Sequence, residues 1–343
     1  MDDAPQHGPR PLPLFLDMLR EETAASSERR AAALAGLNAY QTAERGAIRT
    51  LPEARFGAGK ACLRDYGGAG RPVVFVPSLI NPPFILDLAP QNSLLRWCSE
   101  GGLHPWLLDW GQPDPGDRDL DATTHVEQRL VPLIEQLDEP PLLVGYCLGG
   151  TLAYAAAAVA DVAGVAAIAA PWHFAGFGAA RADIAALWDA AKPGCERMGL
   201  VPMEVLQAGF WRLDPGRTVS KYEAFGRMEP GSEAWRGFVA LEDWANDGAP
   251  LTYAAGRELF EDFVAGDVTG RGAWRVGGTI VDPRALPCPS VEFVSLSDRI
   301  VPKESAAGLA DRRDLGAGHV GMVIGGSARA RLWQPLAEWL RTA

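Results

Sequence analysis

The segment from residue 141 to residue 160 constrains the fold most, because a short apolar run is followed there by a glycine-rich turn and an alanine-rich stretch. The run Leu142, Leu143 and Val144 has the apolar character of a buried strand, and the alanines that follow the turn favour a helix. The turn itself is Gly-Tyr-Cys-Leu-Gly-Gly at 145–150. The segment therefore predicts a strand, a sharp turn and a helix, with the thiol of Cys147 at the apex.

Small residues flank this cysteine on both sides. In a strained turn, a side chain at Gly145 or Gly149 would clash with the neighbouring strand or helix. The N–H groups at the start of the following helix favour a thiolate and help to hold an oxyanion. The alternative is a buried structural cysteine between two glycines that allow helix packing. The strand before Cys147 and the helix after it favour a nucleophile elbow, the catalytic turn of α/β-hydrolases.

Composition excludes several classes of protein. The chain has 343 residues, 48% of them hydrophobic, which is enough for roughly two domains or for one α/β domain with an insertion. A net charge of −11 argues against nucleic-acid binding. No apolar run approaches the about 18 residues of a membrane span, and the first residues lack the pattern of a signal peptide. Five cysteines without Cys-x-x-Cys spacing indicate a reduced, cytoplasmic chain with no metal site.

Apolar patterning along the chain predicts alternating strands and helices around a mostly parallel sheet. Strands are expected at 59–66, 71–77, 104–110, 162–170 and 290–296, and helices at 88–98, 122–138, 253–264 and 328–341. The fold class is therefore α/β, with helices on both faces of the sheet.

Three regions follow from where this alternation starts and stops. Residues 1–58 are expected to form an N-terminal helical extension, with about the first ten residues disordered. Residues 59–173 and 251–343 form the predicted α/β core. Residues 174–250 are rich in aromatic side chains and have no visible parallel strand, so they are predicted to be a helical cap inserted into the core.

An elbow needs a base and an acid that orients it, and in this fold the acid and then the histidine follow the nucleophile along the chain. Asp298 comes directly after a predicted strand, and His319 lies in a glycine-rich loop near the C-terminal end. The alternatives are an aspartate that caps a turn and a histidine in a surface loop. Oxyanion N–H groups are expected at Leu148, after the nucleophile, and at Leu79, after the strand at 71–77.

Together with the cysteine turn, a series of motifs in order along the chain resembles the polyhydroxyalkanoate synthases, most of all the short catalytic subunit of class III. The other matching segments are Val-Pro-Ser-Leu-Ile-Asn-Pro at 76–82, Ile-Leu-Asp-Leu-Ala-Pro-Gln-Asn-Ser at 85–93, Leu-Leu-Asp-Trp-Gly at 107–111, Leu-Glu-Asp-Trp at 241–244, Asp-Arg-Ile-Val-Pro at 298–302 and Gly-His-Val-Gly at 318–321. The resemblance implies Cys147 as the acyl nucleophile, His319 as the base and Asp298 as the residue that orients it.

The same resemblance implies a substrate and partners. The substrate would be 3-hydroxyacyl-CoA, the product a growing polyester chain, and no cofactor would be needed beyond the CoA thioester itself. A separate accessory subunit or a homodimer is implied, in the cytoplasm and on polymer granules. Two alternatives stay open: a Cys-dependent hydrolase, such as a thioesterase or an intracellular depolymerase, and a non-catalytic relative that binds granules. The intact set of Cys147, Asp298 and His319 argues against the second.

Overall fold

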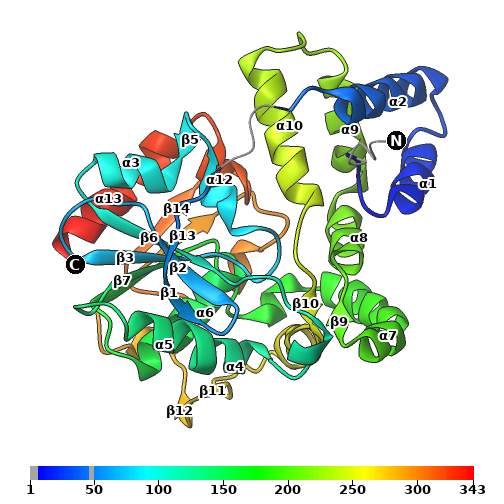
Figure 1. Ribbon diagram of the computed structural model, residues 1–343. Helices are drawn as coiled ribbons and strands as arrows, with labels where there is room; N and C mark the ends of the chain where they lie inside the picture. Colours follow the sequence, from blue (N-terminus) through cyan, green and yellow to red (C-terminus); the bar gives the residue numbers. More distant parts are fainter. Residues whose placement is uncertain (1–6, 46–49) are drawn as a thin grey trace. The chain divides into compact units, whose positions relative to one another are not determined.

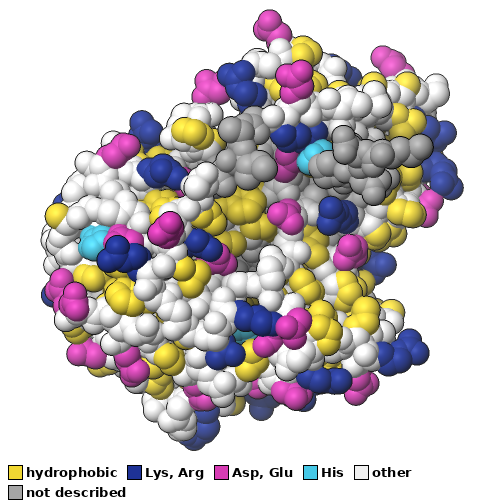
Figure 2. Space-filling model, in the orientation of Figure 1, with side chains coloured by type: hydrophobic (Ala, Val, Ile, Leu, Met, Phe, Trp, Pro, Cys, Tyr) yellow, Lys and Arg dark blue, Asp and Glu magenta, His cyan; other side chains and the backbone are white. Residues whose placement is uncertain are grey.

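The computed structural model describes residues 7–45 and 50–343, which divide into two compact units (Figure 1). The larger unit contains Leu51–Pro202 and Ala249–Ala343, and the smaller one contains Met1–Thr50 and Met203–Gly248. The disorder predicted for the first ten residues falls, for residues 1–6, outside the described part of the chain. On the face drawn in Figure 2, basic and acidic side chains are interspersed.

The larger unit is built on an eight-stranded sheet in the order β1-β2-β6-β3-β7-β8-β13-β14. Strands β1 and β2 pair antiparallel, as do β2 and β6, and the remaining pairs are parallel. The strands are β1 Ala54–Ala58, β2 Ala61–Asp65, β3 Pro72–Val76, β6 His104–Asp109, β7 Leu142–Tyr146, β8 Gly164–Ile168, β13 Ser290–Ser295 and β14 Arg312–Leu315. Every residue of β3, β7 and β8 is buried, as expected for the centre of a parallel sheet covered on both faces.

Helices surround this sheet, with α3 and α13 on one side of it and α5 and α6 on the other (Figure 1). The α-helices of the larger unit are α3 Leu94–Glu100, α4 Ala122–His125, α5 Val131–Ile134, α6 Leu148–Val159, α7 Ala180–Met198, α11 Tyr253–Arg257, α12 Gly321–Ile324 and α13 Gln334–Thr342. π-Helical segments adjoin three of these helices. Val126–Leu130 continues α4, Glu258–Ala265 continues α11, and Arg329–Trp333 precedes α13. The α/β fold predicted from the sequence, with a mostly parallel sheet and helices on both of its faces, is confirmed.

Three short two-stranded antiparallel pairs also belong to the larger unit. They are β4 Asp87–Ala89 with β5 Asn92–Ser93, β9 Leu200–Val201 with β10 Leu251–Thr252, and β11 Arg275–Val276 with β12 Thr279–Ile280. The helix predicted at 88–98 is therefore only partly correct: a hairpin occupies its first half, and α3 begins at Leu94, where the side chain of Ser93 caps the Arg96 N–H.

The smaller unit is helical and brings together two separate parts of the chain. Its helices are α1 Leu12–Glu22, α2 Ser27–Thr42, α8 Met203–Leu213, α9 Pro215–Phe225 and α10 Glu233–Asn246. They share one apolar core, formed by Phe15, Leu19, Ala33, Leu37 and Tyr40 with Trp211, Val219, Tyr222, Phe225 and Val239. Helices α2 and α9 pack so closely that a Cβ at Gly36 would lie 1.9 Å from the carbonyl oxygen of Tyr222.

These limits differ from the domain limits expected from the sequence. The N-terminal helices were expected to be an extension of their own, and they share a core with α8, α9 and α10. The segment 174–202, expected in the cap, belongs to the larger unit, where the side chain of Arg181 in α7 donates to the carbonyls of Val264 and Ala265. Within the described ranges, no helix is both long and apolar enough to cross a membrane.

Candidate active site

Strand β7 runs directly into helix α6, and Cys147 occupies the turn between them. Its backbone has φ 56° and ψ −133°, a conformation that non-glycine residues rarely adopt. Two backbone hydrogen bonds fix it: the Cys147 N–H donates to the carbonyl of Ile168 at 2.9 Å, and its own carbonyl accepts from Gly150 at 2.9 Å. The predicted strand, turn and helix are confirmed, and the thiol is half-buried at the N-terminus of α6.

The glycines on each side of the turn have no room for a side chain. A Cβ at Gly145 would lie 2.3 Å from the Cα of Gly150, at the start of α6, and a Cβ at Gly149 would lie 2.1 Å from the carbonyl oxygen of Val76, at the end of β3. Both obstacles are backbone atoms, which cannot move aside without shifting a strand or a helix. The steric argument made from the sequence for these two positions is therefore confirmed.

The structure brings His319 and Asp298 to this turn. His319 lies just before α12, and Asp298 lies just after β13. The Nδ1 of His319 is 2.6 Å from Oδ2 of Asp298, and the same imidazole is hydrogen-bonded to the thiol of Cys147. The three side chains thus form a continuous hydrogen-bonded series from sulfur to carboxylate.

Backbone donors and an aromatic ring hold this series in place. The other carboxylate oxygen of Asp298 accepts from the N–H groups of Ile300, at 2.7 Å, and Val301, at 3.0 Å, and the Asp298 side chain is fully buried. The ring of Tyr146 stacks on the imidazole of His319 with centroids 5.1 Å apart, and its hydroxyl donates to the carbonyl of His319 at 3.3 Å. The imidazole is therefore fixed at both of its edges and over one face.

The electrostatics of the site favour a charged imidazole. Burial by itself lowers the pKa of His319, but the negative charges of Cys147 and Asp298, with hydrogen bonds to both, raise it to about 10. This is the behaviour of a histidine placed between two anions. A thiol next to such a cation is in the setting in which cysteine becomes a nucleophile.

The two expected oxyanion donors lie on the elements predicted for them. Leu148 is the first residue of α6, where N–H groups have no partner within the helix. Leu79 is buried in the loop after β3, and in that loop Ser78 Oγ accepts from the Ile80 N–H at 3.0 Å. Their role as an oxyanion hole stays a prediction.

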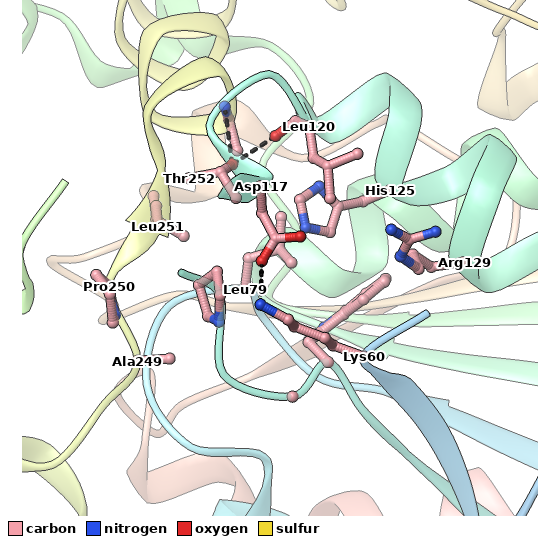
Figure 3. A pocket seen from close by; sticks show the side chains of 14 residues that line it. Lys60, Leu79, Asp117, Leu120, His125, Arg129, Ala249, Pro250, Leu251 and Thr252 are labelled. Carbon is pink, nitrogen blue, oxygen red and sulfur yellow. Dashed lines mark hydrogen bonds and ion pairs between the residues drawn. The ribbon is translucent and has the colours of Figure 1, made fainter. Parts of the chain in front are cut away.

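A pocket on the larger unit meets the loop that carries Leu79, although Cys147, Asp298 and His319 do not line it (Figure 3). Its empty volume, which includes its open mouth, is about 470 Å³. The lining residues are Lys60, Leu79, Trp110, Gly111, Pro113, Asp117, Leu120, His125, Arg129, Ala249, Pro250, Leu251, Thr252 and Ala255. This pocket was not predicted from the sequence, because four separate segments of the chain form it: Lys60, Leu79, 110–129 and 249–255.

Metal ligands do not gather anywhere in the described ranges: no group of three or more His, Cys, Asp or Glu side chains is placed to hold an ion there.

The fold and the site together are those of an α/β-hydrolase. The model of the alpha/beta hydrolase family matches residues 73–332, more than half of the chain, so the chain belongs to that family. An epoxide hydrolase from Bacillus megaterium has the same fold, with a TM-score of 0.55 at 14% identity over 84% of this chain and 99% of that one.

Curated relatives narrow the similarity further. The chain is 27% identical over 289 residues to the poly(3-hydroxyalkanoate) polymerase subunit PhaC of Haloferax mediterranei, a match covering 78% of this chain and 58% of that protein. It is 25% identical to the subunit of the same name from Haloarcula marismortui, over 78% and 60% of the two chains. The chain is also 25% identical to the subunit of the same name from Allochromatium vinosum, over 78% of this chain and 80% of that protein. These relatives bear out the resemblance seen in the motifs, although the chain spans less than two thirds of the first two.

Proposed function

We propose that this chain is an acyltransferase that joins 3-hydroxyacyl groups from CoA thioesters into a polyhydroxyalkanoate, with a thioester on Cys147 as intermediate and free CoA as by-product. The observation that carries the proposal is the hydrogen-bonded series from Cys147 through His319 to Asp298 at a strained strand–helix turn. Support also comes from curated relatives that are named poly(3-hydroxyalkanoate) polymerase subunits.

In the first half-reaction, Cys147 takes the acyl group. His319 holds the thiol proton, and the Cys147 sulfur attacks the thioester carbonyl carbon. The N–H groups of Leu148 and Leu79 bind the oxygen of the tetrahedral intermediate. The carbon–sulfur bond to CoA then breaks, the CoA sulfur takes the proton from His319, and the acyl group stays on Cys147.

In the second half-reaction, a hydroxyl group replaces CoA as the partner of the acyl group. Acylation turns the Cys147 sulfur into a neutral thioester and so removes one of the two charges that raise the pKa of His319. The pKa of His319 falls as a result, and the imidazole becomes a base for the incoming hydroxyl. The hydroxyl oxygen attacks, an ester forms, and Cys147 leaves as the thiolate beside a protonated His319.

Cysteine suits this sequence of steps better than serine. Transfer from CoA to Cys147 exchanges one thioester for another, so little free energy is lost and the driving force is kept for ester formation. A serine ester would spend that driving force in the first step. The reaction uses the CoA thioester as a substrate and needs no other cofactor. An accessory subunit or a second copy of the chain, and attachment to polymer granules, belong to the same proposal.

The test is to incubate the purified chain with 3-hydroxybutyryl-CoA and to analyse all products. We expect free CoA, a polyester and an acyl adduct on Cys147 by intact-mass spectrometry. Cys147→Ala should give neither adduct nor CoA, and Cys147→Ser should lose most turnover because an alkoxide is much harder to form than a thiolate. Cys288→Ala, at a half-buried cysteine outside the site, is the matched control and should behave like the parent.

Two results would overturn the proposal. Release of free 3-hydroxybutyrate without polymer would identify a Cys-dependent hydrolase instead. An adduct that persists in Cys147→Ala would place the nucleophile elsewhere.

A further inference from the structure

The pocket beside Leu79 has a polar end and an apolar wall. Leu79, Leu120, Pro250 and Leu251 supply apolar side chains, and Lys60, Asp117, His125, Arg129 and Thr252 supply polar ones. Figure 3 shows the imidazole of His125 turned toward the side of the pocket where Asp117 lies. Such a lining suits a small ligand with an aliphatic part and one polar group.

His125 and Thr252 are the buried polar residues that line this pocket, and His125 has 9% of its surface exposed. Its Nδ1 donates to the carbonyl of Asp121 at 2.7 Å, which requires the proton to be on Nδ1. Burial lowers the pKa of His125, so the ring is neutral and Nε2 carries a bare lone pair. Within the part of the chain that the structure describes, Nε2 has no hydrogen-bond partner, so it is the atom left to accept a proton donor from a ligand.

The charges around the pocket balance. Lys60 Nζ lies 2.5 Å from a carboxylate oxygen of Asp114 and 2.6 Å from one of Asp117, and Arg129 forms no ion pair within the described residues. Two cations and two carboxylates leave no net charge to attract a phosphate. The Lys60 ammonium has three protons, of which two go to the carboxylates, so one donor remains. A hydroxyl group, which both donates and accepts, matches an acceptor on His125 and a donor on Lys60.

Leu79 connects this pocket with the reaction. In the function proposed above, the Leu79 N–H binds the thioester carbonyl oxygen, and the same residue lines the pocket. We infer that the acyl carbon atoms next to that carbonyl extend toward the pocket. In a 3-hydroxyacyl thioester, the hydroxyl is two carbons from the carbonyl.

We propose that this pocket binds the hydroxyl-bearing acyl part of a 3-hydroxyacyl thioester, whose hydroxyl donates a hydrogen bond to Nε2 of His125. The proposal rests on the function proposed above and deepens it: His125 makes the enzyme prefer hydroxylated acyl groups over plain ones. His125 binds substrate and takes no part in bond making or breaking.

The experiment compares two variants of His125, each of which replaces one of the two ring nitrogens and removes the other. In His125→Asn, the side-chain amide reaches the position of Nδ1 and keeps a donor for the Asp121 carbonyl, but nothing replaces Nε2. In His125→Gln, the amide reaches the position of Nε2 and supplies an acceptor there. Acylation of Cys147 is followed by intact-mass spectrometry with 3-hydroxybutyryl-CoA and with butyryl-CoA, and thermal unfolding checks that both variants fold.

For the parent, we expect faster acylation with the hydroxylated substrate. In His125→Asn, the ratio of the two rates should fall about tenfold, the value of one lost hydrogen bond, while the butyryl rate stays near that of the parent. His125→Gln should recover part of the ratio. An equal loss with both substrates would mean that the pocket binds the CoA portion they share, and an unchanged ratio would mean that His125 contacts neither; both results overturn the proposal. A parent that forms no adduct with either substrate would instead refute the proposed function.

Discussion

Replacing Cys147 with Ala is expected to change the protonation of His319 even without substrate. In the parent, the pKa of His319 is about 10, so about 99% of the imidazole is protonated at pH 8. The change removes the Cys147 charge and its hydrogen bond, leaving burial, which lowers the pKa, against Asp298, which raises it. One nearby charge shifts a pKa by about one to three pH units, so His319 in the variant should titrate at a clearly lower pH.

Side-chain ¹⁵N NMR of the histidines between pH 6 and pH 10.5 measures this directly, and His319→Gln identifies the resonance. Cys98→Ala is the matched control: burial raises the pKa of the Cys98 thiol to about 12, so that change removes no charge near pH 8. If His319 titrates at the same pH in Cys147→Ala as in the parent, the thiolate is not the source of the raised pKa, and the ion-pair argument fails.

Three further predictions follow from the same site. Asp298→Asn keeps the acceptor for the N–H groups of Ile300 and Val301 but turns an amide toward Nδ1 of His319. Acylation of Cys147 should therefore slow by up to about 10⁴-fold, and by less if the thiolate forms easily. A rate within twofold of the parent would mean that another acid orients the ring. Gly149→Ala should destabilise the fold by about 3 kcal/mol in urea unfolding because its Cβ meets the Val76 carbonyl, whereas Gly326→Ala, with nothing within 4 Å, should not. Tyr146→Leu removes the ring stacked on His319 and should slow acylation more than Tyr146→Phe, which removes only the hydroxyl; equal rates would exclude a role for stacking.

Local sequence patterns were sufficient to predict the central strands of the sheet and the turn that carries Cys147. The central strands are continuous apolar runs, and the elbow combines a strand, three glycines and an alanine-rich helix, so both could be predicted. Strand β14 was missed because Arg312, Arg313 and Asp314 occupy an edge position, where charged residues conceal a strand. The capping signal of Ser93 was present in the sequence and would have placed the start of α3 correctly.

The parts that could not be predicted depend on contacts between distant residues. Chain order placed Asp298 and His319 on the correct elements, but the stacking of Tyr146 on His319 joins residues 173 positions apart. The neutral state of His125 depends on burial, and its tautomer depends on the carbonyl of Asp121; neither leaves a pattern in the sequence. The shared core of the smaller unit likewise requires the chain to return after about 150 residues.

That shared core has a consequence for synthesis on the ribosome. Helices α1 and α2 emerge before their apolar partners in α8, α9 and α10, which end only at residue 246. At a translation rate of about 5–20 residues per second, roughly 10 to 40 s pass between the synthesis of α2 and the end of α10. Helices of 11 and 16 residues are marginal on their own, so Phe15, Leu19 and Tyr40 lack their apolar partners throughout this interval. We therefore expect residues 12–42 to bind a chaperone during translation, and slower translation would lengthen that exposure.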